Sequence, residues 1–407
     1  MLLIAAPGQG AQAPGFLAPW LELPGFADRL AAWSDLARCD LIRYGTTAGA
    51  EEITDTAIAQ PLLVAAAVAA AEALAGGLTQ LRRQAGMAAG HSVGELGAGA
   101  IAGVVSPEDA IRMTGVRGQA MAAAAAAGAT GMTAVLGGDE AEVLAAIEAH
   151  GLTPANVNGA GQIVAAGTAE QLAAFAASPP ARARLRPLAV AGAFHTRHMA
   201  PAAAALRSAA ATVAASDPEI ILLSNRDGAA VRSGADWLER IITQVSAPVR
   251  WNLCLESMLS LGVSAMIELP PAGPLTGLAR RGLPGVALAA VRTPADLDAA
   301  RALLAEHGTP DPHADTHAPE WRLLVAPAAG TFRAGAGAAA GPPGMAVTSG
   351  AMLGHVETRS GRHAVSPVFP ARVLEWLVED GDPVSTGQPL LRLQPDGSTD
   401  VPATGAE

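Results

Sequence analysis

The sequence predicts an α/β protein that carries a second, smaller unit inserted in its chain and a small β-sandwich near its C-terminal end. Three observations indicate this architecture: apolar strands that run into glycine-rich turns, a stretch with the order strand-helix-strand-strand-helix-strand, and an internal repeat of short strands. With 407 residues, the chain is also long enough for two or three folded units with substantial cores.

The first part of the chain alternates predicted strands and helices. Leu2–Ala6 is an apolar strand that runs into the turn Pro7–Gly10, and residues 87–89 lead in the same way into the motif GHSVGE at Gly90–Glu95. A helix is expected directly after this motif, and another opens at Ser106, where a serine cap precedes a proline and two acids. Apolar strands return later, at 220–223, 265–269 and 286–291.

The inserted unit is expected between about 130 and 194, where the pattern changes to a strand, a helix, two strands, a helix and a strand. Its second helix follows a capping box at Thr168–Gln171. This order is that of a ferredoxin-like unit. Because apolar strands like those of the first part return after residue 194, we expect the small unit to be inserted in the larger one.

The C-terminal part contains the repeat. Residues 294–320 end in the polar stretch GTPDPHADTHAP, which predicts a linker. Beyond it, the pattern G-x-x-V-[ST]-[ST]-G-x-x-L begins at Gly344 and again at Gly381. Two copies of a short-stranded unit predict a small pseudo-symmetric β-sandwich over 321–395, and we expect the tail 396–407 to be disordered.

Composition restricts the possible partners. The net charge of −11 argues against nucleic acid, which requires a concentrated basic surface. Cys39 and Cys254 stand far apart without neighbouring metal ligands, so we expect buried thiols and no metal site. The apolar run 62–71 is too short to span a bilayer, and the N-terminus lacks the basic lead of a signal peptide. A cytoplasmic protein without a membrane partner is therefore expected.

Ser92 stands between Gly90 and Gly94, at a predicted passage from strand to helix. This setting fits a nucleophile elbow, in which larger flanking side chains would collide with nearby backbone, although a plain glycine-lined turn has the same pattern. Among the nine histidines, His195 is the best candidate base for the serine. His91 adjoins the serine and is expected to point away from it.

Six motifs occur in a recognisable order. They are Gly8-Gln9-Gly10-Ala11-Gln12, Gln60-Pro61, GHSVGE, Val116-Arg117-Gly118, Asn156-x-Asn158 with Gln162, and Ala193-Phe194-His195. With them, the chain from Met1 to about Val291 resembles the malonyl-CoA:acyl carrier protein transacylases. The resemblance implies an α/β-hydrolase-like large subdomain formed by 1–127 and 196–293, with a ferredoxin-like subdomain at 128–195.

The resemblance also implies a reaction without a cofactor. Ser92 would attack the thioester of malonyl-CoA while His195 takes its proton, and the malonyl group would pass to the phosphopantetheine thiol of acyl carrier protein, for fatty acid or polyketide synthesis. The backbone N–H groups of Gln9 and Val93 would hold the oxyanion. The backbone carbonyl of Gln244 would orient the histidine in place of an aspartate.

The substrate-binding residues that the resemblance implies are Arg117, Gln60, Asn156, Asn158, Gln162 and Phe194. The guanidinium of Arg117 would bind the free malonyl carboxylate through two parallel hydrogen bonds. It would disfavour binding of acetyl groups, which would leave the buried charge without a partner. The alternative is a helix arginine that bridges to Asp109 or Glu95. Phe194 would disfavour a 2-methyl branch, or would simply be a core residue.

The region from about Trp321 to Leu393 resembles a biotinyl or lipoyl carrier domain, on the motifs at Ala326–Phe332 and Val378–Val384. Such domains attach their cofactor to a lysine in a hairpin between the repeats. All 26 basic residues of this chain are arginine, and the hairpin reads Glu357–Gly361 without lysine. Attachment of biotin or lipoate is therefore excluded chemically, and we expect a degenerate relative of the carrier domains.

The sequence is also compatible with two other functions. A serine hydrolase of thioesters would use the same serine and histidine, but it has no need of Arg117. A non-catalytic assembly subunit would explain the degenerate carrier domain, but not the intact serine, histidine and arginine. The arginines at 182, 184, 186, 280 and 281 are either solvated charge or surfaces that receive an acidic carrier protein.

Overall fold

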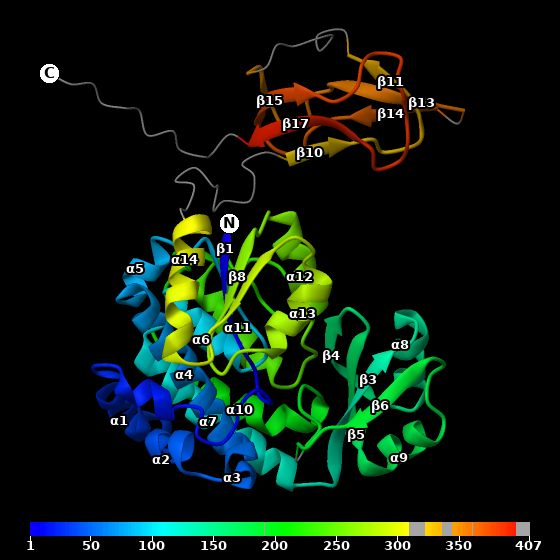
Figure 1. The fold of residues 1–407 in the computed structure, drawn as a ribbon. Coiled ribbons are helices and arrows are strands. Elements are labelled where there is room, and N and C mark those ends of the chain that lie inside the picture. The colour runs from blue at the N-terminus through cyan, green and yellow to red at the C-terminus, as the bar shows by residue number, and fades with distance from the viewer. Residues whose placement is uncertain (191, 309–321, 336–343, 360, 396–407) are drawn as a thin grey trace, which may run out of the picture. The chain divides into compact units, whose positions relative to one another are not determined.

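The computed structural model describes residues 1–190, 192–308, 322–335, 344–359 and 361–395. The chain divides into two compact units, Met1–Asp311 and Pro312–Glu407. The first unit mixes helices with two sheets, and the second contains only strands among its described residues, so the protein belongs to the α/β class (Figure 1).

A five-stranded parallel sheet forms the centre of the first unit. Its strands, in spatial order, are β7 (Ile221–Leu222), β2 (Met87–Gly90), β1 (Leu2–Ala6), β8 (Ala265–Glu268) and β9 (Ala287–Ala290). Side chains of β1 alternate between two apolar cores, with Leu2 and Ile4 in one and Leu3 in the other. Because parallel strands end at the same edge, the turns after β1 and β2 lie side by side there.

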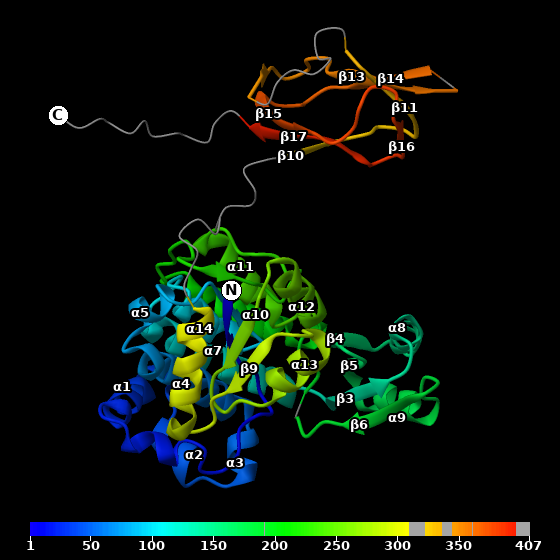
Figure 2. The ribbon, with the colours of Figure 1, turned by 45° about the horizontal axis from the view of Figure 1, so that its top comes forward.

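Helices cover both faces of this sheet (Figure 2). The helices of this unit outside the small sheet are α1 (Phe26–Ala37), α2 (Leu41–Thr46), α3 (Ala50–Thr54), α4 (Thr56–Ala75), α5 (Leu78–Arg82), α6 (Gly94–Ile101), α7 (Pro107–Ala126), α10 (Ala200–Ala210), α11 (Gly234–Gln244), α12 (Trp251–Ser260), α13 (Pro274–Gly282) and α14 (Leu297–His307), with the short 3-10 helices η1 (Ala18–Glu22), η2 (Arg197–Met199) and η3 (Pro294–Asp296).

Helix α4 contains the apolar run predicted at 62–71. In the described part of the chain it is the one helix whose length and composition would allow it to cross a membrane, but 78% of its most apolar window is buried inside the protein. It packs along α7, and a Cβ on Gly118 of α7 would lie 2.9 Å from the carbonyl oxygen of Thr56 at the start of α4. The run is therefore a buried core helix, as the sequence indicates.

A second, four-stranded antiparallel sheet occupies the middle of the chain. Its spatial order is β4 (Thr153–Gly159), β5 (Gln162–Thr168), β3 (Thr130–Gly137) and β6 (Ala183–Pro187), and α8 (Glu140–Ala149) and α9 (Ala169–Ala177) pack on one face. On the other face, Met132, Ala134 and Val164 join the main core of the first unit. The chain order of these elements is the one predicted from the sequence.

The second unit consists of two four-stranded antiparallel sheets around one core. One contains β10 (Arg322–Val325), β17 (Pro389–Pro395), β15 (Ala371–Trp376) and β12 (Ala346–Val347), and the other contains β14 (Gly361–Val365), β13 (Gly354–Thr358), β11 (Gly330–Ala334) and β16 (Pro383–Val384). The repeated glycines have matching left-handed backbones, with φ of 95° at Gly344 and 96° at Gly381. Since this conformation favours glycine, the repeat in sequence reflects a repeated turn.

The linker predicted over 294–320 is wrong in its first part. Residues Pro294–Asp296 and Leu297–His307 are helical, and Leu297, Ala300 and Leu304 are buried in the main core. Their three- and four-residue spacing was an available helical signal that the polar stretch downstream obscured. The rest of the predicted linker, 309–320, and the predicted tail, 396–407, lie outside the described residues.

We predict that Gly94→Ala destabilises the first unit by an amount on the order of 2 kcal/mol, because its new Cβ would lie 2.3 Å from the carbonyl oxygen of Ala6. The matched control is Gly97→Ala in the same helix, where the nearest atom is 3.7 Å away. That change should be neutral or stabilising, since alanine favours helix. Equal free energies of unfolding for the two variants, measured by denaturant titration, would contradict this prediction.

Candidate active site

Ser92 lies in the turn between β2 and α6 with φ of 53°, a left-handed conformation that is unusual for a residue other than glycine. A Cβ on Gly90 would lie 2.1 Å from the backbone of Gly94, so bare backbone is required on both sides of the serine. The Ser92 N–H donates to Asn225 Oδ1 at 2.7 Å, and Asn225 Nδ2 donates to the Gly90 carbonyl at 2.8 Å. Asn225 therefore fixes this strained turn.

His195 lies directly against the serine. Its Nε2 is 2.7 Å from Ser92 Oγ, and its Nδ1 is 2.8 Å from the backbone carbonyl of Gln244. Burial lowers the pKa of His195 to about 3, and the positive charge of Arg117 acts in the same direction. The imidazole is therefore neutral, with the proton on Nδ1 and a free lone pair on Nε2 toward the hydroxyl.

Arg117 reaches the same point from α7 and is buried to 1% exposure. One terminal nitrogen donates to Gln60 Oε1 at 2.7 Å, and the other to Gln244 Oε1 at 2.9 Å and to Ser92 Oγ at 3.3 Å. Burial lowers its pKa to about 10, which leaves it charged at neutral pH.

Neither carboxylate that the sequence offered as a partner of Arg117 forms an ion pair with it among the described residues. Asp109 pairs instead with Arg112, which lies one helical turn after it on α7. Arg117 is thus a buried cation held by neutral amides, an arrangement that favours the arrival of an anion.

The turn after β1 brings two further groups to the site. The side chain of Gln9 donates to Thr54 O at 3.2 Å and to Thr56 Oγ1 at 3.3 Å, which ties this turn to the start of α4. The backbone N–H groups of Gln9 and Val93 have no hydrogen-bond partner within the described part of the chain. Each of the two adjoining turns therefore offers one free donor.

Three other residues predicted to bind substrate lie on the small sheet. Asn158 Oδ1 is 2.9 Å from His91 Nε2, so His91 points away from the serine, as expected, and its ring meets Trp251 edge-on. Asn156 and Gln162 lie on β4 and β5. Within the ranges that the structure describes, no hydrogen bond joins either of them to Ser92, His195 or Arg117.

Phe194 is buried in the main core, beside His195 in the chain. The exposed arginines of β6 and those at the end of α13 form two separate groups, because β6 is one edge of the small sheet and α13 contacts β4 at the other edge.

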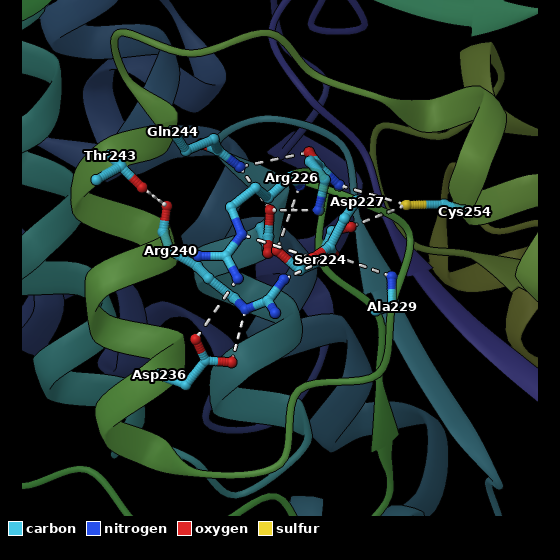
Figure 3. A network of polar contacts seen from close by, with 11 residues as sticks. Ser224, Arg226, Asp227, Ala229, Asp236, Arg240, Thr243, Gln244 and Cys254 are labelled. Atoms are coloured by element: carbon cyan, nitrogen blue, oxygen red, sulfur yellow. Dashed lines mark hydrogen bonds and ion pairs between the residues drawn. The ribbon is translucent and has the colours of Figure 1, made fainter. Parts of the chain in front are cut away.

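Sequence reasoning missed the polar network behind the serine turn. The Gln244 side-chain amide donates to Glu95 Oε2 at 2.6 Å and to the Ser92 carbonyl at 3.1 Å, and Glu95 Oε2 also accepts from the Asn225 N–H at 3.2 Å. Burial raises the pKa of Glu95 to about 7. One turn before Gln244 on α11, Arg240 binds Asp227 and Asp236, each at 2.7 Å (Figure 3).

Comparisons with known proteins agree with this geometry. The model of the acyl transferase domain family matches residues 6–295. The malonyl CoA-acyl carrier protein transacylase of Mycobacterium tuberculosis is 53% identical over 298 residues, which are 73% of this chain and 98% of that protein. The transacylase of Escherichia coli is 32% identical over 306 residues, covering 72% of this chain and 96% of its own length.

Solved structures give the same result. The crystal structure of MCAT from Mycobacterium tuberculosis superimposes with a TM-score of 0.71 over 73% of this chain and 98% of that one, at 53% identity. A malonyl-transacylase solved in complex with a type II PKS acyl-carrier protein gives 0.68 at 30% identity, over 74% of this chain and 99% of its own. The chain therefore belongs to the acyl transferase domain family, among the malonyl-CoA:acyl carrier protein transacylases.

Proposed function

We propose that this protein transfers a malonyl group from malonyl-CoA to the phosphopantetheine thiol of acyl carrier protein, through a malonyl ester on Ser92. The observation that carries the proposal is the position of Arg117, a buried guanidinium with neutral partners 3.3 Å from the Ser92 hydroxyl. A hydrolase of simple thioesters would not require such a cation. A transferase of diacid thioesters does, because the far carboxylate needs a partner in a dry site.

The first half-reaction follows from the hydrogen bonds of Ser92. His195 Nε2 accepts the hydroxyl proton while Oγ attacks the thioester carbonyl. The free N–H groups of Gln9 and Val93 stabilise the oxyanion. When the tetrahedral intermediate collapses, the C–S bond breaks and the imidazolium returns its proton to the CoA sulfur. The carrier thiol then reverses these steps, which frees Ser92.

We assign the selectivity for malonyl over other acyl groups to Arg117 and the residues around it. Gln60 and Gln244 hold the guanidinium without neutralising it, so that its charge remains available to the malonyl carboxylate. We assign Phe194 to exclusion of a 2-methyl branch. Asn156, Asn158 and Gln162 are proposed to line the substrate path, with Asn158 acting through His91.

We also propose the finer description of the fold. The parallel sheet with its covering helices supports an α/β-hydrolase-like subdomain from 1–127 and 196–293, and the order β4-β5-β3-β6 supports a ferredoxin-like subdomain at 128–195. The two antiparallel sheets support a biotinyl/lipoyl-like sandwich that lacks an attachment lysine. The exposed arginines on β6 and α13 are candidate contacts of the carrier protein. The cytoplasmic location expected from the sequence remains a prediction.

Mass spectrometry after mixing with malonyl-CoA should show one added malonyl group, and Ser92→Ala should abolish it because the acceptor oxygen is gone. Arg117→Ala should lower malonyl loading by roughly a hundredfold and improve acetyl relative to malonyl loading, since a buried charge pair is lost. Arg112→Ala is the matched control: this arginine is exposed on the same helix, and its loss should change neither rate. Undiminished malonylation of Ser92→Ala would refute the proposed intermediate.

The pH dependence of loading follows from the neutral state of His195. Its pKa of about 3 lies below the usual value of 6.5, so the folded protein keeps the basic form through the whole neutral range. At saturating malonyl-CoA, stopped-flow rates of ester formation should therefore show no histidine inflection between about pH 8 and pH 5.5. A tenfold fall in rate per pH unit below about pH 6.5, retained in Glu95→Gln, would show instead that the imidazole titrates normally.

Truncation should separate the two units. A chain that ends at Asp311 retains the whole first unit, so we predict undiminished malonyl loading. A chain that ends at Asp296 also loses α14 with its buried Leu297 and Leu304, which should cost several kcal/mol, on the order of two leucine truncations in a core. Thermal unfolding and loading of both chains test this, and a folded but inactive 1–311 protein would show that the second unit takes part in loading.

A further inference from the structure

Glu95 is a buried carboxyl that the proposed mechanism does not use. It is 1% exposed and lies in the first turn of α6, behind the serine. Its Oε2 accepts from Gln244 Nε2 at 2.6 Å and from the Asn225 N–H at 3.2 Å. Burying a carboxyl is unfavourable unless its contacts compensate, and these contacts lead directly to Gln244.

The side chain of Gln244 connects Glu95 with Arg117. An amide has a donor end and an acceptor end, which differ chemically but have nearly the same shape. The nitrogen end faces Glu95 Oε2, the Ser92 carbonyl and, at 3.3 Å, Asn225 Oδ1, while the oxygen end accepts from Arg117 at 2.9 Å. A reversed amide would place NH₂ against the guanidinium, donor against donor.

We infer that Glu95 is a positioning residue for Arg117, the proposed partner of the malonyl carboxylate. By accepting from the Gln244 amide nitrogen, Glu95 fixes the orientation of that amide. The amide oxygen then directs Arg117 toward the substrate carboxylate. This inference rests on the proposed function. An ionised carboxylate accepts hydrogen bonds and donates none, so it excludes the reversed amide.

The helix and the backbone carbonyl of Gln244 are held by other contacts, so its side-chain amide is the part that can change orientation. Arg240 on the same helix is held by Asp227 and Asp236, which anchors the last turn of α11 (Figure 3). The backbone carbonyl of Gln244 is occupied by His195 Nδ1. Burial raises the pKa of Glu95 to about 7, while its hydrogen bonds and the charge of Arg240 act in the opposite direction, so the carboxyl is ionised above neutral pH. Glu95 therefore acts on the arginine through the side chain, and the histidine contact is separate from it.

The test compares malonyl with acetyl transfer in the full-length protein at about pH 8.5, where Glu95, with a pKa of about 7, is ionised. Glu95→Gln retains the size of the side chain but can donate to a reversed Gln244 amide. We expect the KM for malonyl-CoA to rise about tenfold, the effect of one hydrogen bond to a charged group, and the malonyl preference over acetyl to fall by the same factor. The single-turnover rate of acetyl loading should stay within about twofold of wild type, since the serine and histidine are untouched.

Glu268→Gln is the matched control. Glu268 is also fully buried, but it accepts from the backbone N–H groups of Leu275 and Thr276 at the start of α13. Its change should lower stability without altering the malonyl-to-acetyl ratio. A purely structural role of Glu95 would give the same result in both variants, and that outcome would overturn the inference.

A double-mutant cycle with Gln244→Ala provides the second measurement. This variant removes the amide but keeps the carbonyl that contacts His195, so its malonyl preference should fall as in Glu95→Gln, and adding Glu95→Gln should have no further effect. Additive losses would refute the connection. If Glu95→Gln does not fold, an unchanged malonyl-to-acetyl ratio in Gln244→Ala refutes it alone. Failure of the wild-type protein to form malonyl-Ser92 would instead refute the proposed function.

Discussion

The site depends on the parallel pairing of β1 with β2, which sets Ala6 beside Gly90 at the end of both strands. This register brings the two following turns into contact, so closely that Gly94 leaves no space for a Cβ against the Ala6 carbonyl. Ser92 then has to adopt its left-handed backbone, which costs on the order of 1 kcal/mol. Asn225 holds this conformation from both sides. The backbone N–H groups of Gln9 and Val93, one in each turn, have no hydrogen-bond partner in the described chain.

A second feature is the way in which charge is separated behind the serine. Arg117 and Glu95 are both buried; burial lowers the pKa of Arg117, and the negative charge of an ionised Glu95 acts in the opposite direction. The Gln244 amide lies between them and bonds to both. A direct ion pair would neutralise the guanidinium and remove its attraction for a substrate carboxylate. With the amide between them, the carboxyl of Glu95 is near enough to reduce the cost of burying Arg117, but it does not occupy the guanidinium.

Sequence reasoning predicted the parts of the site that are encoded locally. Ser92 between its glycines, His195 after Phe194, and Arg117 stand in short motifs whose spacing the structure brings together. The repeat at Gly344 and Gly381 was also readable, because each copy needs the same left-handed turn. The α14 helix was missed where a polar stretch downstream dominated the composition of the segment.

The contacts of Asn225 and Glu95 could not be predicted in the same way. Asn225 lies 133 positions from Ser92 along the chain, and no local pattern sets a distance of that kind. Glu95 was visible in the GHSVGE motif, but its partner Gln244 lies 149 positions away. Which end of an amide faces a carboxylate is decided by tertiary packing alone. Short motifs therefore identify the reacting groups, and the family resemblance also identified the Gln244 carbonyl, while the contacts of Asn225, Glu95 and the Gln244 amide emerge only from the fold.

Among the described residues, His195 Nδ1 meets a backbone carbonyl and no carboxylate, an arrangement that fits the chemistry of thioesters. A carbonyl acceptor fixes the tautomer, but it does not stabilise an imidazolium, and the nearby Arg117 disfavours one further. Expulsion of an amine needs a strong proton donor, whereas a thiol, with a pKa of about 8.5, leaves readily. An imidazolium that forms only briefly returns its proton at once to the departing sulfur. A weakly basic imidazole also removes a proton from a thiol far more readily than from water, whose pKa is about 15.7, so the same poor stabilisation favours transfer of the acyl group to a thiol over hydrolysis of the Ser92 ester.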